Sequence, residues 1–157
     1  MKKFICLILF FTSFCMIAQS KKEIKKNKIK SLLVTSEESG KTQNDSKILY
    51  NEDGDMAEEI EYEKNGEIKK TIRYKYNNVG DPIEESEFDK SGKCKEKKQM
   101  KYNGLGEKTE EIIYDSNNTI LKKHNFTYDK RGLKTERVTK NADGKIISKR
   151  KYSYESK

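Results

Sequence analysis

Few side chains in this 157-residue chain are of the types that catalyse reactions, and their positions argue against catalysis. His124 is the only histidine, so no histidine pair can hold a metal or relay a proton. Cys94 stands in a column of aliphatic residues, where a small buried side chain is a simpler interpretation than a nucleophile. Four carboxylates recur every 26 residues, as structural residues of a repeat do: Glu58, Glu84, Glu110 and Glu136. We therefore predict that the protein is not an enzyme and that it holds no metal or cofactor.

A column of tyrosines is the other set of side chains with binding chemistry. Aromatic rings on a sheet can stack on the faces of sugar rings. The same rings supply much of the apolar surface that the chain has, so packing within the fold is the competing interpretation. We single out this column as the candidate ligand-stacking residues: Tyr50, Tyr76, Tyr102, Tyr128 and Tyr154.

The elements that position these residues are predicted to be short hairpins. Turn residues recur at intervals that alternate between 12 and 14, which makes the true unit a double hairpin of 26 residues. About four units run from 48 to 151, and Tyr152 to Tyr154 open a fifth. We predict an all-β fold, a twisted antiparallel meander of tandem β-hairpins in a single-layer or curled sheet. The turn residues are Gly54, Gly66, Gly80, Gly92, Gly106, Asn118, Gly132 and Gly144.

The numbering of the apolar residues predicts how the strands pair. Those that recur in columns with the 26-residue period, such as Tyr76, Phe88 and Ile120, all have even numbers, which predicts one apolar and one charged face. Loops with an odd number of residues keep that parity, and a three-residue loop ending in a left-handed glycine fits best. This register predicts three apolar pairs, Tyr62 with Ile68, Phe88 with Cys94 and Tyr114 with Ile120. It also predicts three charged pairs, Glu84 with Lys98, Glu110 with His124 and Glu136 with Arg150.

The N-terminal region has a different composition. Residues 1–19 combine Lys2 and Lys3 with an apolar run too short to span a bilayer, which is the form of a secretory signal peptide. Lipoprotein processing at Cys15 and a membrane anchor are weaker alternatives. Residues 20–47 form a basic segment with a degenerate half repeat, and 48–157 form the repeat domain. The tract from Lys21 to Lys30 is expected to be a solvated tail, with contact to an acidic polysaccharide or lipid surface as the alternative.

Composition limits what the exported part can be. Without residues 1–19 it has 37 apolar residues in 138, too few for a thick core. It carries 32 basic and 26 acidic residues, finely mixed, which does not favour a dedicated nucleic-acid surface. No transmembrane span is expected after residue 19. Cys94 is then the only cysteine, so no internal disulfide is expected.

Two units resemble the YD repeats of the RHS family. They are Tyr74-Lys-Tyr-Asn-Asn-Val-Gly80 and Phe126-Thr-Tyr-Asp-Lys-Arg-Gly132. The resemblance covers about residues 48 to 154 and implies hairpin repeats that spiral into a sheet, sometimes associated with carbohydrate. The chain departs from the pattern in its alternating spacing and in Asn51, Asn77 and Asn103, where the family has Asp. It is also too short to enclose a cargo.

These observations lead to two predicted functions. The first is an exported, non-enzymatic platform for a protein or carbohydrate partner at the bacterial envelope, in the periplasm, at the cell surface or secreted. The second is a structural spacer without a specific ligand. An apolar sheet face would also need a cover, and self-association through that face is one way to provide it.

Overall fold

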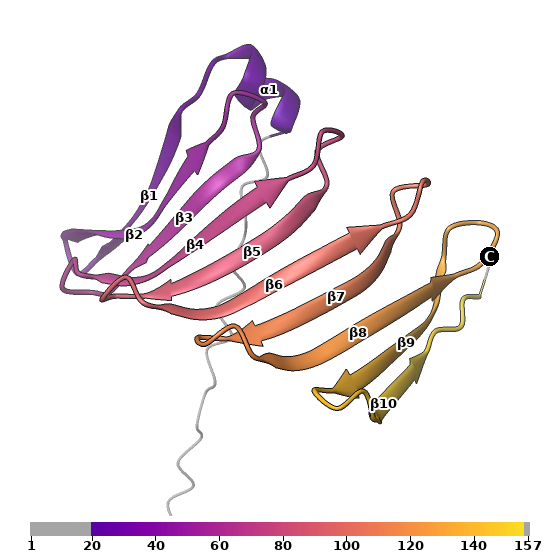
Figure 1. The fold of residues 1–157 in the computed structure, drawn as a ribbon. Helices are drawn as coiled ribbons and strands as arrows, with labels where there is room; N and C mark the ends of the chain where they lie inside the picture. Colours follow the sequence, from indigo (N-terminus) through magenta and orange to yellow (C-terminus); the bar gives the residue numbers. More distant parts are fainter. Residues whose placement is uncertain (1–19, 156–157) are drawn as a thin grey trace, which may run out of the picture.

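The computed structural model describes residues 20–155, which form one short helix and a single ten-stranded sheet (Figure 1). The strands lie in sequence order and every neighbouring pair is antiparallel. This confirms the predicted all-β meander. The predicted signal peptide, residues 1–19, lies outside the described residues. The elements are α1 (Lys21–Lys26), β1 (Ser31–Glu38), β2 (Lys41–Tyr50), β3 (Met56–Tyr62), β4 (Ile68–Tyr76), β5 (Pro82–Asp89), β6 (Cys94–Tyr102), β7 (Lys108–Asp115), β8 (Ile120–Tyr128), β9 (Lys134–Asn141) and β10 (Ile146–Lys151).

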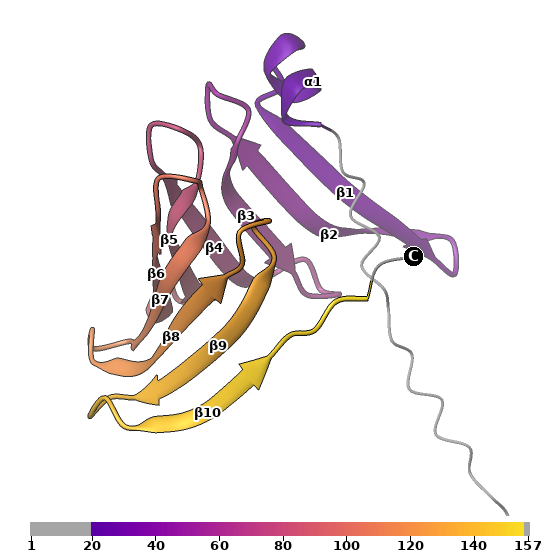
Figure 2. The same cartoon turned by 90° about the vertical axis from the view of Figure 1, so that its right-hand side faces the viewer.

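The sheet is strongly curled and twisted. Figure 2 shows that β1 and β2 at one edge, and β8 to β10 at the other, turn away from the plane of the middle strands. The curl does not bring the edge strands β1 and β10 together as neighbours, so the sheet stays open. A bulge at every hairpin accounts for much of this shape, because an extra residue in one strand increases the local right-handed twist.

The turns form two rows, one at each end of the strands. We call 51–55, 77–81, 103–107 and 129–133 the upper turns, and 63–67, 89–93, 115–119 and 141–145 the lower turns (Figure 1). In each, the first residue donates its N–H to the carbonyl of the fifth, as Asn77 does to Asp81 at 3.0 Å. The fourth residue has positive φ, from 61° at Asn118 to 90° at Gly80. The predicted three-residue loop with a left-handed last residue is therefore confirmed in all eight turns.

Asparagine or aspartate occupies the first position of every one of these turns except 63–67, which begins with Glu63. The Asn77 Oδ1 accepts hydrogen bonds from the N–H groups of Val79 and Asp81, at 3.1 and 2.8 Å. The Asp129 Oδ1 accepts the same two bonds from Arg131 and Leu133, at 2.9 and 3.0 Å. Both residue types supply the side-chain oxygen that accepts these bonds. In the 63–67 turn the Asn65 Oδ1 accepts the Glu67 N–H instead, at 3.0 Å.

The prediction that one face carries all the even-numbered apolar residues is wrong. In the strand that follows each upper or lower turn, one residue near the turn has no partner in the preceding strand. Beyond it, even-numbered residues of one strand pair with odd-numbered residues of the other, whereas next to the turn even pairs with even. Tyr62 pairs with Ile68, but beyond the bulge Glu61 pairs with Lys70. The extra residues are Ala57, Lys69, Ile83, Lys95, Thr109, Leu121, Thr135 and Ile147.

This shift corrects the predicted charged pairs and leaves the apolar ones intact. The three pairs nearest the lower turns form as predicted, namely Tyr62 with Ile68, Phe88 with Cys94, and Tyr114 with Ile120. The three pairs beyond the bulge are displaced by one residue. Glu84 is opposite Gln99 rather than Lys98, Glu110 is opposite Asn125 rather than His124, and Glu136 is opposite Lys151 rather than Arg150.

The bulges divide the apolar residues between two faces. Away from the turns, even-numbered residues of β2, β4, β6, β8 and β10 lie on the same face as odd-numbered residues of β3, β5, β7 and β9. We call this the inner face and the opposite one the outer face. Among the described strands, every buried residue except Ser86 lies on the inner face. The buried residues there are Ser46, Glu59, Met100, Ile113, His124, Phe126 and Thr139.

The N-terminal region also differs from expectation. The basic tract is not a solvated tail, because Lys21–Lys26 form a helix whose Ile24 is only 2% exposed. The hairpin of β1 and β2 occupies the predicted degenerate half repeat, but Glu38 pairs with Lys41 across a two-residue loop, Ser39 and Gly40. Positive φ at both loop residues is the geometry of a tight two-residue turn, so this hairpin does not have the odd-length loop expected for the repeats.

Candidate functional site: two repeated clefts at the upper turns

The five candidate tyrosines form one row along the upper turns, at the end of the inner face. Four of their hydroxyls donate to a backbone carbonyl 20 residues earlier, at the start of the neighbouring strand. The bonds run from Tyr76 to Met56 at 2.8 Å, Tyr102 to Pro82 at 2.9 Å, Tyr128 to Lys108 at 2.9 Å, and Tyr154 to Lys134 at 2.8 Å. These bonds, which we call the tyrosine clamps, link each upper end to the strand before it.

The clamps hold the rings in fixed positions, and burial favours the protonated form of three of the phenols. Burial, and then the negative charge of Asp55, raise the pKa of Tyr76 from 10.0 to about 12. Burial raises the pKa of Tyr102 and Tyr128 as well. A protonated hydroxyl is required, because only the O–H form can donate to a carbonyl. The fifth tyrosine of the column, Tyr50, lies beside α1.

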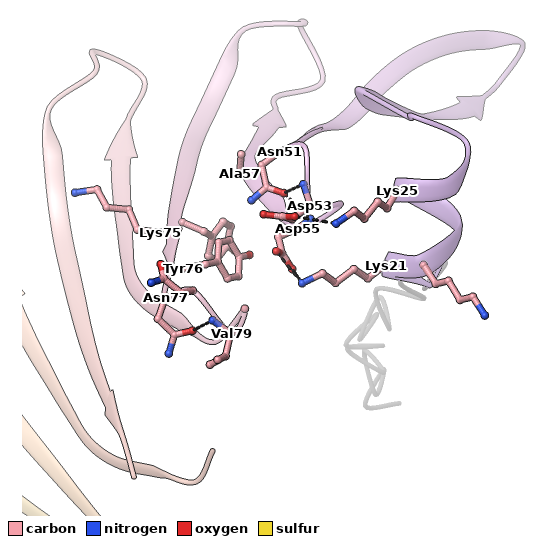
Figure 3. A pocket seen from close by; sticks show the side chains of 14 residues that line it. Lys21, Lys25, Asn51, Asp53, Asp55, Ala57, Lys75, Tyr76, Asn77 and Val79 are labelled. Carbon is pink, nitrogen blue, oxygen red and sulfur yellow. Dashed lines mark hydrogen bonds and ion pairs between the residues drawn. The ribbon is translucent and has the colours of Figure 1, made fainter. Parts of the chain in front are cut away.

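The first cleft lies between α1 and two successive upper turns, and has a volume of about 860 Å³ (Figure 3). Tyr74 and Tyr76 provide its aromatic wall, with Lys75 between them. The turn residue Asn51 lines one side and Asn77 the other. Asn78 also lines it and is exposed. The cleft therefore combines aromatic rings with amide, ammonium and carboxylate groups.

Helix α1 closes one side of the first cleft. The Lys21 Nζ lies 2.7 Å from an Asp55 carboxylate oxygen, and the Lys25 Nζ lies 2.9 Å from Asp53. The hydrogen bond and charge of Lys25 hold the pKa of Asp53 below its ordinary value. A Cβ at Gly54 would stand 2.8 Å from the Lys21 carbonyl oxygen, so the helix backbone lies directly against this turn.

The second cleft is the same site one repeat later. It has a volume of about 540 Å³ and is lined by the turns of β4–β5 and β6–β7. Every residue that lines it stands 26 positions after a residue that lines the first cleft. Tyr102 replaces Tyr76, Asn103 replaces Asn77, and Gly104 replaces Asn78. The repeat in the sequence is therefore also a repeat of a concave surface, with α1 present only at the first copy.

The residues considered for catalysis are spread over the sheet and do not meet in either cleft. His124 lies in β8, where its Nδ1 is 2.9 Å from the Thr139 hydroxyl, and burial lowers its pKa. Cys94 is a free, half-buried thiol opposite Phe88 at the lower end. Within residues 20–155, no group of three or more His, Cys, Asp or Glu side chains is placed to hold a metal ion.

Sequence reasoning missed the part of the site that α1 contributes. A signal for it is present, because Ser20 and Glu23 have the spacing of a capping box at a helix start. The Ser20 Oγ does accept a hydrogen bond from the Glu23 N–H, at 3.3 Å. Nothing in the local sequence indicated that the helix would dock on a turn 30 residues away, since that contact depends on the bend at Gly54.

Comparisons with known proteins found only remote similarities, all of them to solved structures. No family model matches the chain, and no curated protein matches it. Among solved structures, a porin-like protein from Bacteroides uniformis is similar at 17% identity and a TM-score of 0.46, over 79% of this chain and 49% of that one. TarM is similar at 15% identity and a TM-score of 0.33, over 80% and 22%. A protein of unknown function from Bacteroides fragilis has 14% identity and a TM-score of 0.16, over 81% and 96%.

These similarities carry no argument about function, because identities and TM-scores are low and the chain spans half or less of the first two proteins. The described residues contain no helix that is both long and apolar enough to cross a membrane.

Proposed function

We propose that this protein is an exported, non-enzymatic binding module of the bacterial envelope, and that it binds a carbohydrate chain along the upper turns. Export rests on residues 1–19, whose basic start and short apolar run have the form of a signal peptide. The resemblance of the hairpins to YD repeats, a family sometimes associated with carbohydrate, is compatible with this proposal.

One observation carries the proposal, namely that two clefts lined by the same positions of the 26-residue repeat follow one another. The residue types differ at some of these positions, since Tyr74 and Asp53 of the first cleft correspond to Met100 and Val79 of the second. Strands lie about 4.8 Å apart, so equivalent turns two strands apart lie about 10 Å apart before twist is added. That spacing is comparable to one disaccharide of an extended polysaccharide. A linear glycan could therefore place equivalent sugars in successive clefts, against Tyr76 and then against Tyr102.

The tyrosine clamps support this proposal. Each clamp fixes a ring before any ligand arrives, which lowers the entropy cost of binding. Because the hydroxyl is occupied by a backbone carbonyl, only the ring remains for stacking. A phenylalanine at the same position should then retain much of the affinity for a sugar.

The clamps also favour the second candidate function, a structural spacer without a specific ligand. Four hydroxyls bonded to backbone carbonyls show that the column is used to hold the fold together. In that case the clefts are a consequence of the turn geometry.

A panel of linear oligosaccharides, built from neutral, amino and uronic-acid sugars, separates the two functions. The variant Gly104→Tyr fills the second cleft, and it should be tolerated because nothing lies within 4 Å of a Cβ there and φ is not positive. We expect it to weaken binding of a panel member by at least about tenfold. Asn78→Tyr should do the same at the first cleft, and Lys64→Tyr in a lower turn is the matched control.

The carbohydrate proposal fails if no panel member binds, or if the lower-turn control weakens binding as much as the two cleft variants. Either result, in a protein that keeps its thermal stability, would favour the structural spacer. Measurement by calorimetry gives affinity and stoichiometry together, and a long oligosaccharide that spans both clefts should bind more tightly than one that fills a single cleft.

A further inference from the structure

A third concave surface lies between α1 and the end of β2, next to the first cleft, with which it shares Lys25 and Asn51. It is a groove of about 810 Å³, within the size range of small-molecule sites. Its walls are mainly hydrocarbon, from Ile24, Ile29, Leu49 and the ring of Tyr50. Walls of this composition suit an alkyl chain and offer little to a sugar.

The rim of the groove is basic. Lys25, Lys28 and Lys30 line it, together with one carboxylate, Glu52. Lys25 is paired with Asp53 at 2.9 Å. Within residues 20–155, the ammonium groups of Lys28 and Lys30 make no ion pair. An anionic group at the mouth of the groove would find two cations against the single charge of Glu52.

Lys28 occupies a backbone position that normally belongs to glycine. It ends α1 with a φ of 51°, its N–H bonds the Lys25 carbonyl at 3.2 Å, and the Ile29 N–H bonds the Ile24 carbonyl at 3.0 Å. These two bonds are the helix-ending motif in which glycine relieves the left-handed strain. A lysine there strains the backbone and places an ammonium group on the groove.

We propose that this groove binds a free fatty acid, with its alkyl chain along Ile24, Ile29 and Leu49 and its carboxylate at Lys28 and Lys30. The apolar walls and the unpaired lysines are complementary to the two ends of such a molecule. The groove adjoins the first carbohydrate cleft and shares Lys25 and Asn51 with it, but the residues assigned here to the fatty acid line only the groove. No bond is made or broken in it.

Calorimetric titration of the purified protein with dodecanoate, below its micelle-forming concentration, tests the proposal. Dodecanoate should bind at one site. Dodecanol, which has the same chain without the charge, should bind at least about tenfold more weakly, and acetate should give no measurable binding. Leu49→Ser should weaken dodecanoate and dodecanol together.

The decisive variant is Lys28→Gly, because it removes the cation while placing glycine at the left-handed position that favours it. We expect an unchanged or higher thermal stability and an affinity for dodecanoate reduced by about tenfold, with dodecanol unaffected. Lys22→Ala, which removes a lysine of α1 that lines the first cleft and not the groove, is the matched control.

The proposal is overturned if dodecanoate does not bind, if Lys28→Gly binds it as the unaltered protein does, or if Lys22→Ala weakens binding equally. It is also overturned if sedimentation shows a dimer that Leu49→Ser dissociates, because the groove would then be covered by a second copy of the chain.

Discussion

The upper and lower turns use the same loop, yet they secure their strands by different means. In the upper row, tyrosine hydroxyls reach back to backbone carbonyls on the inner face. In the lower row, the aromatic residues lie on the outer face, and two of them, Phe88 and Tyr114, contact cations. The Arg73 guanidinium stands 4.8 Å from the centre of the Phe88 ring, and the Lys97 ammonium stands 4.9 Å from that of Tyr114.

This difference explains why one column keeps tyrosine and the other accepts phenylalanine. A cation over a ring needs only the ring, so Phe88 serves as well as Tyr114. A clamp needs the hydroxyl, and every column member from Tyr76 to Tyr154 has one. The upper ends are also where α1 docks and where the clefts form, so the two rows should respond differently to substitution.

The largest contrast is expected between two glycines of nearly equal φ. Gly66→Ala, in a lower turn with nothing within 4 Å of the new Cβ, should cost about 1 kcal/mol from left-handed strain. Gly54→Ala, in an upper turn, should cost at least about 2 kcal/mol, because the Cβ also collides with the backbone of α1. Urea unfolding measures both. Equal losses would mean that α1 does not dock on the 51–55 turn.

Removing single hydroxyls should give a smaller contrast. Tyr102→Phe breaks a clamp to the Pro82 carbonyl and should cost about 1 kcal/mol. Tyr114→Phe removes a bond to the side-chain oxygen of Gln99, which can turn toward water, and should cost about 0.5 kcal/mol. Thermal unfolding of the two variants at neutral pH compares them, and a larger loss at Tyr114 would contradict the role assigned to the clamps.

The clamp of Tyr76 should also affect how the stability of the protein depends on pH in the alkaline range. Its pKa is about 12 in the fold and 10.0 ordinarily, so its contribution to stability is complete below pH 10 and is lost as the pH rises toward 12. Urea midpoints between pH 9 and 12 should therefore fall more steeply for the unaltered protein than for Tyr76→Phe. Parallel curves would show that the Tyr76 proton is not held by the fold.

The smallest effect is expected where a lower turn already tolerates a substitute for glycine. Asn118→Gly should change stability by only a few tenths of a kcal/mol, because asparagine visits the left-handed region easily and the Lys97 bond it loses is exposed. Asn118→Ala should instead cost about 1 kcal/mol. Circular dichroism melts of the two variants test this, and a large loss on Asn118→Gly would point to a further contact of the amide.

The repeat and its turns could be read from the sequence because they depend on short-range chemistry. The spacing of the turn residues predicted the turns of the meander from β2 to β10. It did not predict the first hairpin, β1–β2, where the loop has two residues. Pairs adjacent to a turn, such as Tyr62 with Ile68, were predictable because a three-residue loop leaves no alternative there. The candidate tyrosines were also found in the sequence, as one column, and they do lie in one row.

The bulges and the docking of α1 could not be predicted in this way. A bulge after each turn adds one residue to a strand without leaving a turn signal, and each one moves the following side chains to the other face. Glu110 therefore meets Lys101 and Lys123, at 2.8 and 3.3 Å, in place of His124. The second half of each cleft comes from another repeat or from α1, so its lining appears only when strands are stacked.

The sequence by itself determined a protein of tandem hairpins with glycine or asparagine turns and regularly placed tyrosines, because loop length and left-handed backbone are properties of a few neighbouring residues. Only the tertiary structure decided which face each side chain occupies, what the tyrosine hydroxyls bind, and where the clefts and the groove lie. Those features depend on the twist that the bulges introduce and on contacts between segments 20 or more residues apart, such as Tyr76 with Met56 and Lys21 with Asp55.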